Sequence, residues 1–402
     1  MYQPTLCIDV SKSKSFASAF LSPTKQFSKP FAFTHTEDGM KQVKSVLNQI
    51  QLDTNTKPTI VLEATGNYSK SLVGYFQAIG YDVVILNPLT TSTQKRKSMR
   101  KVKTDPIDTY RIAQVYYLNN CSPNISIDEK YEDLRNLCRQ WDGINTLYTE
   151  TQLRFQSILD LVMPDLNKVF NDLCSPTCIE LVCNYPTFST ILDAGKDNIM
   201  DVLKISKQSK EWRSKKAELL LSIARESLPY DKAQQSNLQV LKSYITILKT
   251  IKKELTDMRA LIVSRADSLS EFRLLTSIPG VGEITAATIL GEIGDISRFD
   301  SPKKLIAYAG LDPSVFQSGK FNAKNNKISK RGSHYLRKAL YQATFAGVSK
   351  QKWGIRNTTL YQYYTKKREE GKAMKSALTA TSGKLLRIIY GILKNGEAFK
   401  TT

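Results

Sequence analysis

The spacing of apolar side chains changes near residue 128, and this change constrains the fold most. Before it, short apolar runs alternate with helix-like stretches; after it, apolar residues recur every three or four positions over long segments. Such a change predicts a mixed α/β domain followed by all-α regions. Strands are expected at 6–10, 16–21, 31–34, 59–63 and 82–86, and helices at 39–51, 69–79 and 108–117.

Two long amphipathic helices are expected after this change. One apolar stripe runs from 134 to 162 and ends before Pro164, and the second runs from 238 to 262. The second stripe suits packing within its own fold, and its length also suits an antiparallel coiled coil that pairs subunits. Between the stripes, Pro176, Pro186 and Gly195 interrupt the pattern, which predicts short helices and a hinge. The predicted domains are 1–125, 126–265 and 266–402.

The charge balance indicates a polyanionic partner. Among the 402 residues, Lys and Arg outnumber Asp and Glu by 58 to 37, a net charge of +21. Such an excess binds nucleic acid through counterion release, whereas a basic membrane-surface protein is the main alternative. No apolar run reaches the length of roughly 18 residues that spans a bilayer, and the N-terminus lacks a signal-peptide pattern. We therefore expect no membrane partner and a cytoplasmic, nucleoid-associated protein.

The six cysteines form no dense framework, so reduced thiols are expected. Cys174, Cys178 and Cys183 invite a zinc interpretation, but their spacing is irregular and both histidines lie far away in the sequence. Burial as small apolar side chains explains these cysteines better.

Four carboxylates form the candidate catalytic centre. Asp9 lies in the apolar run 6–10, Glu63 ends the run 60–63, and Asp105 and Asp108 begin a helix. A carboxylate in an apolar strand is costly to bury without a partner, and oxygen ligands converging from strand ends suit a divalent metal. The alternative for Asp105 and Asp108 is helix capping. Asp105 resembles an N-terminal cap with Pro106 at the first helical position, and Asp108 lies on the same turn like a capping-box acid.

Two basic segments are candidates for nucleic-acid contact. The first, 91–104, directly precedes Asp105 and carries six cations and no acid, which suits holding a phosphate backbone as well as an ordinary solvated surface. The second runs from Ser318 to Lys338 with seven cations and no acid. The candidate contacts are Lys95, Arg96, Lys97, Arg100, Lys101 and Lys103 in the first, and Lys320, Lys324, Lys327, Lys330, Arg331 and Arg337 in the second.

Ser318 is the candidate nucleophile of the second segment. A serine before a glycine, surrounded by cations, has the access and the positive charge that attack on a phosphodiester needs. Ser-Gly pairs are usually turns, and Ser314, Ser329 and Ser333 compete for the role.

A glycine turn precedes an apolar helix at 284–293. Gly280 and Gly282 in the run Ser-Ile-Pro-Gly-Val-Gly resemble a helix-hairpin-helix, in which backbone amides approach a DNA phosphate. A plain turn between helices needs glycine as well.

Taken together, these motifs resemble the DEDD transposases of the insertion sequence one-ten group, which includes the Piv and MooV type DNA invertases. The similar stretches lie in the same order at both ends of the chain. They are 8–12, 63–68, 103–108, 279–282, 308–311, 317–319 and 330–337.

The resemblance implies an N-terminal RuvC-like domain of RNase H fold, a helical coiled coil and a mainly helical C-terminal transposase domain. It implies that Asp9, Glu63, Asp105 and Asp108 bind Mg²⁺ and that Ser318 forms a phosphoserine with DNA. It further implies donor and target DNA as substrates, a bridge RNA as guide, and a dimer or dimer of dimers.

Three functions remain open from the sequence. The first is a serine-dependent, magnesium-assisted recombinase, with transposition or Piv-type inversion as its outcome. The second is a RuvC-like hydrolytic junction nuclease in which Ser318 only contacts phosphate. The third is a nucleic-acid-binding protein without catalysis, whose carboxylates are caps.

Overall fold

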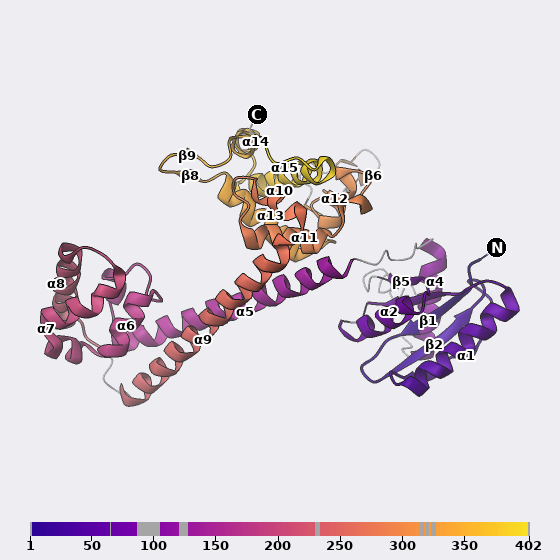
Figure 1. Ribbon diagram of the computed structural model, residues 1–402, viewed down its shortest axis with the longest axis horizontal. Helices are drawn as coiled ribbons and strands as arrows, with labels where there is room; N and C mark the ends of the chain where they lie inside the picture. The colour runs from indigo at the N-terminus through magenta and orange to yellow at the C-terminus, as the bar shows by residue number, and fades with distance from the viewer. Residues whose placement is uncertain are drawn as a thin grey trace. The chain divides into compact units, whose positions relative to one another are not determined.

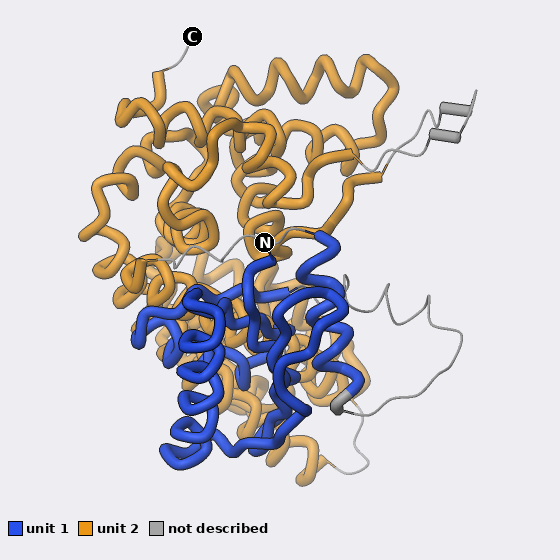
Figure 2. The backbone as a smooth tube through the Cα atoms, turned by 90° about the vertical axis from the view of Figure 1, so that its right-hand side faces the viewer, with its two compact units in different colours: residues 1–126 blue, residues 127–402 orange. Residues whose placement is uncertain are grey.

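The computed structural model divides the chain into two compact units, residues 1–126 and 127–402 (Figure 2). Within them it describes residues 2–64, 66–86, 105–119, 128–229, 234–313, 317–318, 321–322 and 327–400. For 105, 106, 317, 318, 321 and 322 it describes the backbone alone.

Unit 1 is built on a five-stranded mixed sheet with the strand order β3-β2-β1-β4-β5 (Figure 1). The first three strands pair antiparallel, as hairpin connections allow, and β1, β4 and β5 pair parallel through helical crossovers. The elements are β1 (Thr5–Asp9), β2 (Lys14–Phe20), β3 (Phe31–Thr34), α1 (Glu37–Thr54), β4 (Thr59–Glu63), α2 (Tyr68–Ala78), β5 (Val83–Leu86) and α4 (Asp105–Asn119).

Alternate residues of the central strands enter two different cores. Leu6, Ile8 and Leu62 pack in one cluster with the buried side chains of α1 and α2. Cys7 and Val61 face the opposite side and pack with residues of α4. Because β1 and β4 are covered on both faces, they read as continuous apolar runs. All the strands and helices expected before residue 119 are present, with boundaries within a few residues of those expected.

Unit 2 contains two long helices, α5 (Glu129–Val162) and α9 (Gln234–Asp267), which pack antiparallel in one chain (Figure 1). The start of α5 shares a core with the end of α9, and the end of α5 shares another with the start of α9. Midway, the indole Nε1 of Trp141 donates to the carbonyl oxygen of Leu255 at 3.2 Å. The apolar stripes predicted from the sequence are therefore occupied by this intrachain packing.

The region between the long helices folds as short helices around a packed core, so the predicted short helices are present, while the expected hinge stays a prediction. Its buried side chains include Leu166, Phe188 and Leu203, which pack with the end of α5 and the start of α9. Pro176 is the first residue of a helix capped by Ser175, and Thr187 caps the next helix, so these interruptions start helices. The elements are η1 (Leu166–Lys168), α6 (Pro176–Asn184), α7 (Phe188–Val202), η2 (Leu203–Ser206) and α8 (Lys210–Glu226).

The C-terminal helices form the other core of unit 2. A bidentate ion pair joins α5 to this core, with Arg139 Nε 2.6 Å and Nη2 2.9 Å from the Glu292 carboxylate. The elements are α10 (Ser270–Thr276), α11 (Glu283–Ile293), η3 (Ile296–Arg298), α12 (Pro302–Ala309), β6 (Gln317–Ser318), β7 (Phe321–Asn322), α13 (His334–Gly347), β8 (Lys350–Gln351), β9 (Gly354–Ile355), α14 (Thr358–Glu369) and α15 (Met374–Asn395).

Across the described part of the chain, no helix has the length and apolarity needed to cross a membrane. The cysteines described there are free thiols: Cys7, Cys138, Cys174 and Cys178 are buried, and Cys183 is exposed. Cys174 and Cys178 belong to the core of the middle region, as apolar residues would.

Candidate active site and nucleic-acid interface

Asp9 and Glu63 end neighbouring parallel strands and lie on the same face of the sheet. Ile8 of β1 pairs with Leu62 of β4, so Asp9 and Glu63 occupy the next positions on their strands. Asp9 is therefore at the end of its strand, where its side chain is half-buried. Side chains two residues apart share a face, so both carboxylates lie on the side of the sheet that α4 covers.

Asp108 lies on α4 and is buried against the same side of the sheet, with 6% of its surface exposed. It is one helical turn before Ile112, whose side chain packs with Cys7 and Val61. Asp105, the first residue of α4, is one turn earlier on that helix. The fold thus assigns three of the predicted carboxylates to one layer, between the ends of β1 and β4 and the start of α4.

An arginine that the sequence analysis missed pairs with Asp108. Arg111 Nη1 lies 2.8 Å from Asp108 Oδ1, and the two side chains are 14% and 8% exposed. One partner of Asp108 is thus a cation one turn along the same helix. The spacing of three residues was a signal for this pair, but the same spacing is common among solvated surface ion pairs.

The chemistry of this centre suits a hard divalent cation, although its described residues do not form a complete metal cage. Asp9, Glu63 and Asp108 offer only oxygen donors, the ligands that Mg²⁺ prefers. Among the described side chains, no group of three or more His, Cys, Asp or Glu is arranged to hold a metal. Mg²⁺ is commonly held by one or two carboxylates with water and substrate phosphates, an arrangement that the neighbouring Asp9 and Glu63 fit.

Ser318 belongs to an antiparallel segment whose base is closed by hydrogen bonds. Ser318 of β6 pairs with Phe321 of β7, and further back Pro313 pairs with Ile328. At the base, Ser329 donates its backbone N–H to the Asp312 carbonyl at 2.8 Å and its hydroxyl to Asp312 Oδ1 at 2.5 Å. We call residues 312–329 the serine arm; its two ends are thus held together on the C-terminal core.

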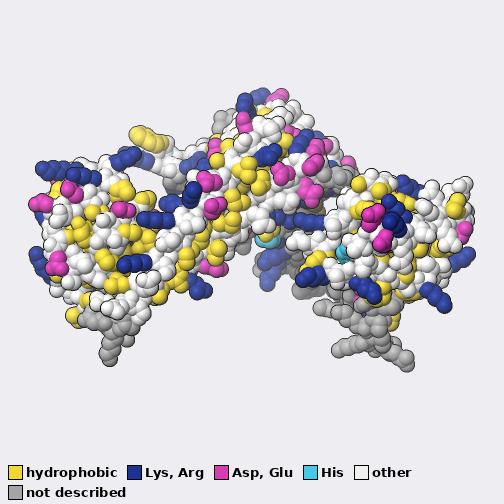
Figure 3. Space-filling view, turned by 60° about the horizontal axis from the view of Figure 1, so that its bottom comes forward, with side chains coloured by type: hydrophobic (Ala, Val, Ile, Leu, Met, Phe, Trp, Pro, Cys, Tyr) yellow, Lys and Arg dark blue, Asp and Glu magenta, His cyan; other side chains and the backbone are white. Residues whose placement is uncertain are grey.

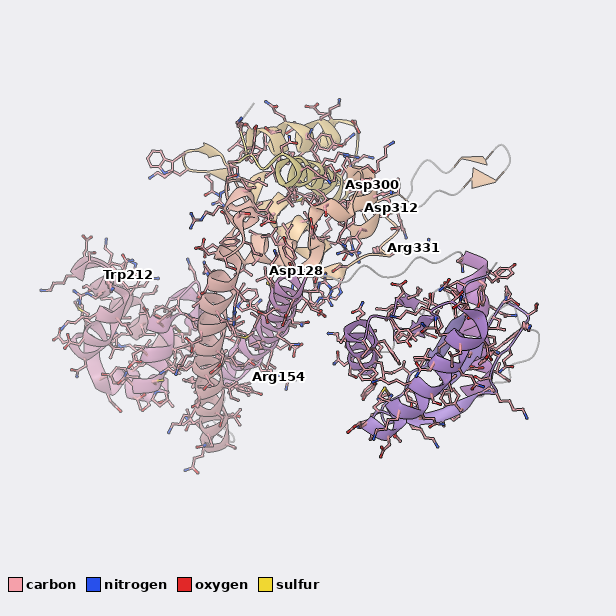
Figure 4. All side chains as sticks on the ribbon, turned by 45° about the vertical axis from the view of Figure 1, so that its right-hand side comes forward. Asp128, Arg154, Trp212, Asp300, Asp312 and Arg331 are labelled. Carbon is pink, nitrogen blue, oxygen red and sulfur yellow. The ribbon has the colours of Figure 1, made fainter. Side chains whose placement is uncertain are left out.

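The polypeptide just after the serine arm is tightly packed against the end of α12. Lys330 has a left-handed φ of 54° and donates its N–H to the Gly310 carbonyl at 3.1 Å; non-glycine residues rarely adopt this conformation. A Cβ at Gly332 would lie 1.8 Å from the Tyr308 carbonyl oxygen, so only glycine fits there. Figure 4 shows Asp312 and Arg331 near each other at this base.

Two of the predicted basic contacts, Arg331 and Arg337, have different surroundings in the structure. Arg331 is exposed beside the arm, where it is available to an anion. Arg337 instead donates through Nη1 to the carbonyl oxygens of Ala309 and Gly332, at 3.0 and 2.7 Å. Burial lowers the pKa of Arg337. Arg337 therefore fastens the base of the arm to α12.

The glycine turn lies between α10 and α11, and packing within the protein explains one of its glycines. Gly280 has a φ of 103°, and a Cβ there would lie 2.6 Å from the Cα of Gly347 on α13. Gly282 precedes α11 and has open space around its Cα. Close helix packing thus explains Gly280, while Gly282 is the better candidate for the predicted phosphate contact.

Several predicted contacts lie outside the described residues. They are Lys95, Arg96, Lys97, Arg100, Lys101, Lys103, Lys320 and Lys324, and the side chains of Asp105 and Ser318. Lys327 and Lys330 are described and exposed, the first within the arm and the second directly after it.

Two family models match the chain, one at each end. A DEDD transposase model matches residues 6–164, and a model described as "Transposase IS116/IS110/IS902 family" matches residues 272–359. The first contains the carboxylate strands and α4, and the second contains the glycine turn and the serine arm. These matches define the class of the DEDD transposases. The chain belongs to the IS110 family of that class, which confirms the resemblance found in its motifs.

The chain is also similar to curated relatives over parts of their length. The "Pilin gene-inverting protein" of Moraxella bovis is 36% identical over 127 residues, 31% of this chain and 38% of that protein. The "Transposase for insertion sequence element IS1111A" of Coxiella burnetii is 28% identical over 162 residues, 40% of this chain and 43% of that protein. The match thus spans less than half the length of either relative.

Among solved structures, the chain is similar to Thermus thermophilus RuvC, titled "T. thermophilus RuvC in complex with Holliday junction substrate". The similarity covers 31% of this chain and 100% of that one, with 8% sequence identity and a TM-score of 0.23.

Proposed function

We propose that this protein is a DNA transposase that cuts, exchanges and rejoins strands through a phosphoserine. The observation that carries the proposal is that one chain of this family combines two motifs. The first is the carboxylates at the ends of β1 and β4, and the second is a serine arm with cationic side chains at its base. The first set suits a metal that binds phosphate, and the second suits a hydroxyl nucleophile.

In this proposal, Asp9, Glu63, Asp105 and Asp108 would hold Mg²⁺, which when bound supplies a Lewis acid for the phosphate oxygens. The strand order β3-β2-β1-β4-β5, with its antiparallel and parallel halves, supports an RNase H-like fold for unit 1. Arg111 would fix the orientation of Asp108, so that the carboxylate would keep its position when DNA binds.

The Ser318 oxygen would attack a DNA phosphorus, forming a serine–phosphate bond while the phosphorus–oxygen bond to one deoxyribose breaks. The serine proton leaves and the departing deoxyribose oxygen takes one up. A deoxyribose hydroxyl of another strand then attacks the phosphoserine, restoring a phosphodiester and a free serine. Because no water enters, the number of diester bonds is conserved, as recombination requires.

The family resemblance adds a bridge RNA that pairs with donor and target DNA, and an oligomer that brings Ser318 to the carboxylates of the same or a neighbouring chain. Exposed apolar side chains on the long helices support the oligomer. Val240, Ile247 and Leu261 on α9 are spaced by seven and fourteen residues and are 38%, 43% and 44% exposed. Figure 3 shows hydrophobic side chains along these helices.

The experiment measures strand cleavage in Mg²⁺. Its substrate is DNA that carries an end of the mobile element, and the reaction contains the RNA transcribed from the sequence beside the reading frame. Asp9→Asn and Glu63→Gln should abolish cleavage while DNA binding survives. The matched control is Asp38→Asn on α1, whose side chain is 91% exposed; it should cleave normally. Cleavage that persists in chelator, or in both active-site variants, would contradict the proposal.

A second candidate is a site-specific DNA invertase, favoured by the 36% identity with the pilin gene-inverting protein over 127 residues. The two functions share the same chemistry and differ in product. A plasmid with inverted sites around a marker distinguishes them: inversion of the marker without an RNA supports the invertase, and RNA-dependent insertion supports the transposase.

A further inference from the structure

The hairpin of β8 and β9 carries a tryptophan at its tip that no other element covers. Lys350 pairs with Ile355 and Gln351 with Gly354, so Lys352 and Trp353 form a two-residue turn. Trp353 is 91% exposed, more than any other described aromatic side chain. An exposed indole forfeits the burial that stabilises most tryptophans, which indicates that it binds a partner. Figure 1 shows the hairpin standing away from α14 and α15.

The surroundings of Trp353 are positively charged. From Val348 to Arg368 the chain has six basic residues and no acid. Lys352 Nζ lies 5.4 Å from the centre of the Trp353 ring, and Lys350 Nζ lies 5.8 Å from that of Tyr361. Lysine is depleted from the cores of protein–protein interfaces, whereas cations next to an aromatic ring are the arrangement that binds single-stranded nucleic acid.

The hairpin is held firmly at its base. Asn357, which is 1% exposed, donates its N–H to the Gly347 carbonyl at 2.9 Å and its Nδ2 to the Pro279 carbonyl at 3.1 Å. Its Oδ1 accepts from the N–H of Leu360 at 3.1 Å, which caps α14. One buried side chain therefore joins the hairpin, α14 and the glycine turn. A tip on a rigid base loses little conformational entropy on binding.

The same contacts connect the hairpin to the second predicted DNA element. Pro279 belongs to the glycine turn, and Gly280 packs directly on Gly347 at the end of α13. The glycine turn and the base of the hairpin are therefore neighbours on unit 2. A duplex phosphate at Gly282 and a base at Trp353 would belong to one continuous contact surface.

We propose that Trp353 stacks on an unpaired base of DNA, with Lys350, Lys352 and Arg356 on the flanking phosphates. This inference rests on the proposed function, because strand exchange creates unpaired bases next to a duplex. Stacking is tolerant of sequence, since every base has an aromatic face. The hairpin would therefore stabilise opened DNA of any sequence, a role different from that of the carboxylates and Ser318.

The test measures binding of the full chain to two DNA oligonucleotides, one fully paired and one with a short unpaired bulge. Trp353→Ala should weaken binding to the bulged DNA about 5- to 150-fold, the effect of losing one base–aromatic stack, and leave the paired duplex unchanged. Trp353→Phe should retain most of the affinity. Lys352→Gln should lower the slope of log affinity against log salt by about 1. Thermal denaturation of each variant checks that the fold is intact.

Tryptophan fluorescence gives an independent readout. Bulged DNA should quench the wild-type emission, and Trp353→Phe should abolish that quenching, although Trp141 and Trp212 remain. If the wild type binds DNA and Trp353→Ala binds bulged DNA equally well, the hairpin proposal is wrong while the proposed function stands. If the wild type binds neither DNA, both are wrong.

Two further outcomes would also overturn the proposal. Weaker binding of Trp353→Ala to a bulged RNA alone would make the hairpin an RNA contact. A smaller oligomer for Trp353→Ala in sedimentation, with DNA affinity unchanged, would make it a contact between copies of this chain.

Discussion

Arg111 and Asp108 form an ion pair across one turn of α4, with 2.8 Å between Nη1 and Oδ1, and both side chains are largely buried. A carboxylate to which the proposed function assigns metal binding is thus paired with a cation in the folded chain. The pair has two consequences, for the stability of unit 1 and for its affinity for metal, and each can be measured.

Replacing Arg111 with Gln should remove a buried counter-charge of Asp108. Breaking a buried pair from one side costs about 3 kcal/mol, so the free energy of unfolding should fall by that order in chelator. Added Mg²⁺ should then stabilise the variant more than the wild type, because the site has become more negative. Urea unfolding with and without Mg²⁺ measures both effects. Lys41→Gln is the control, since its partner Asp38 is exposed and the expected loss is below about 1 kcal/mol.

The bond between Ser329 and Asp312 should determine how well the serine arm is positioned. Ser329→Ala removes a hydrogen bond to a carboxylate, worth about 1.5–3 kcal/mol, at the base of the arm. Strand cleavage should slow about tenfold to 100-fold while DNA affinity is unchanged. Ser268→Ala is the control, because that exposed hydroxyl donates to the Arg265 carbonyl outside the arm. Equal cleavage rates for both variants would show that the base of the arm has no positioning role.

The sheet of unit 1 was predictable because burial on both faces leaves unbroken apolar runs in the sequence. The middle core was not, because Pro176 and Gly195 resemble breaks unless the capping of α6 and the bend inside α7 are known. Gly195 has a φ of 71° within α7, so the helix continues past it in a new direction. Short helices that bury side chains against distant partners leave no regular period.

The candidate site was predictable in its residue types and less so in its contacts. Asp9 and Glu63 are conspicuous as acids at the ends of apolar runs, and the strand register brings them together. The roles of Arg111, Arg337 and Gly280 depend on neighbours that only the fold supplies. The contact of Gly280 with Gly347, for instance, joins residues from separate motifs.

Unit 1 should lose stability in alkali through a buried thiol. Burial raises the pKa of Cys7 from 9.0 to about 12, so the folded state holds this proton more tightly than the unfolded state. The stabilisation is complete below pH 9 and falls by about 1.4 kcal/mol per pH unit between pH 9 and 12. Burial also raises the pKa of Tyr117 from 10.0 to about 12. Its contribution to stability therefore also falls as the pH rises above 10.

The measurement for this prediction is the free energy of unfolding of Cys7→Ala against pH. Its slope between pH 9 and 12 should be shallower than that of the wild type by about one proton. Cys183→Ala, which changes an exposed thiol, should keep the wild-type slope. A wild-type slope in Cys7→Ala would exclude this thiol as the source of the alkaline loss of stability.

The exposed apolar side chains of α9 should contribute to self-association. Ile247→Glu and Leu261→Glu place charges on the line defined by Val240, Ile247 and Leu261. Both should shift the sedimentation of the protein toward the monomer with helix content unchanged, because a charge in an apolar interface is costly to desolvate. Lys242→Glu, on an exposed position of the same helix, is the control for charge alone. An unchanged oligomer in the first two variants would exclude this surface as the interface.

The central claim is that Ser318 becomes covalently joined to DNA. The most direct measurement is mass spectrometry of peptides from a denatured reaction containing wild-type protein, element-end DNA and Mg²⁺, beside Ser318→Ala and Ser314→Ala. We predict a nucleotide-linked peptide containing Ser318 in the wild type and in Ser314→Ala, and none in Ser318→Ala. Cleaved DNA ends free of protein in the wild type, or an unchanged adduct in Ser318→Ala, would contradict the account.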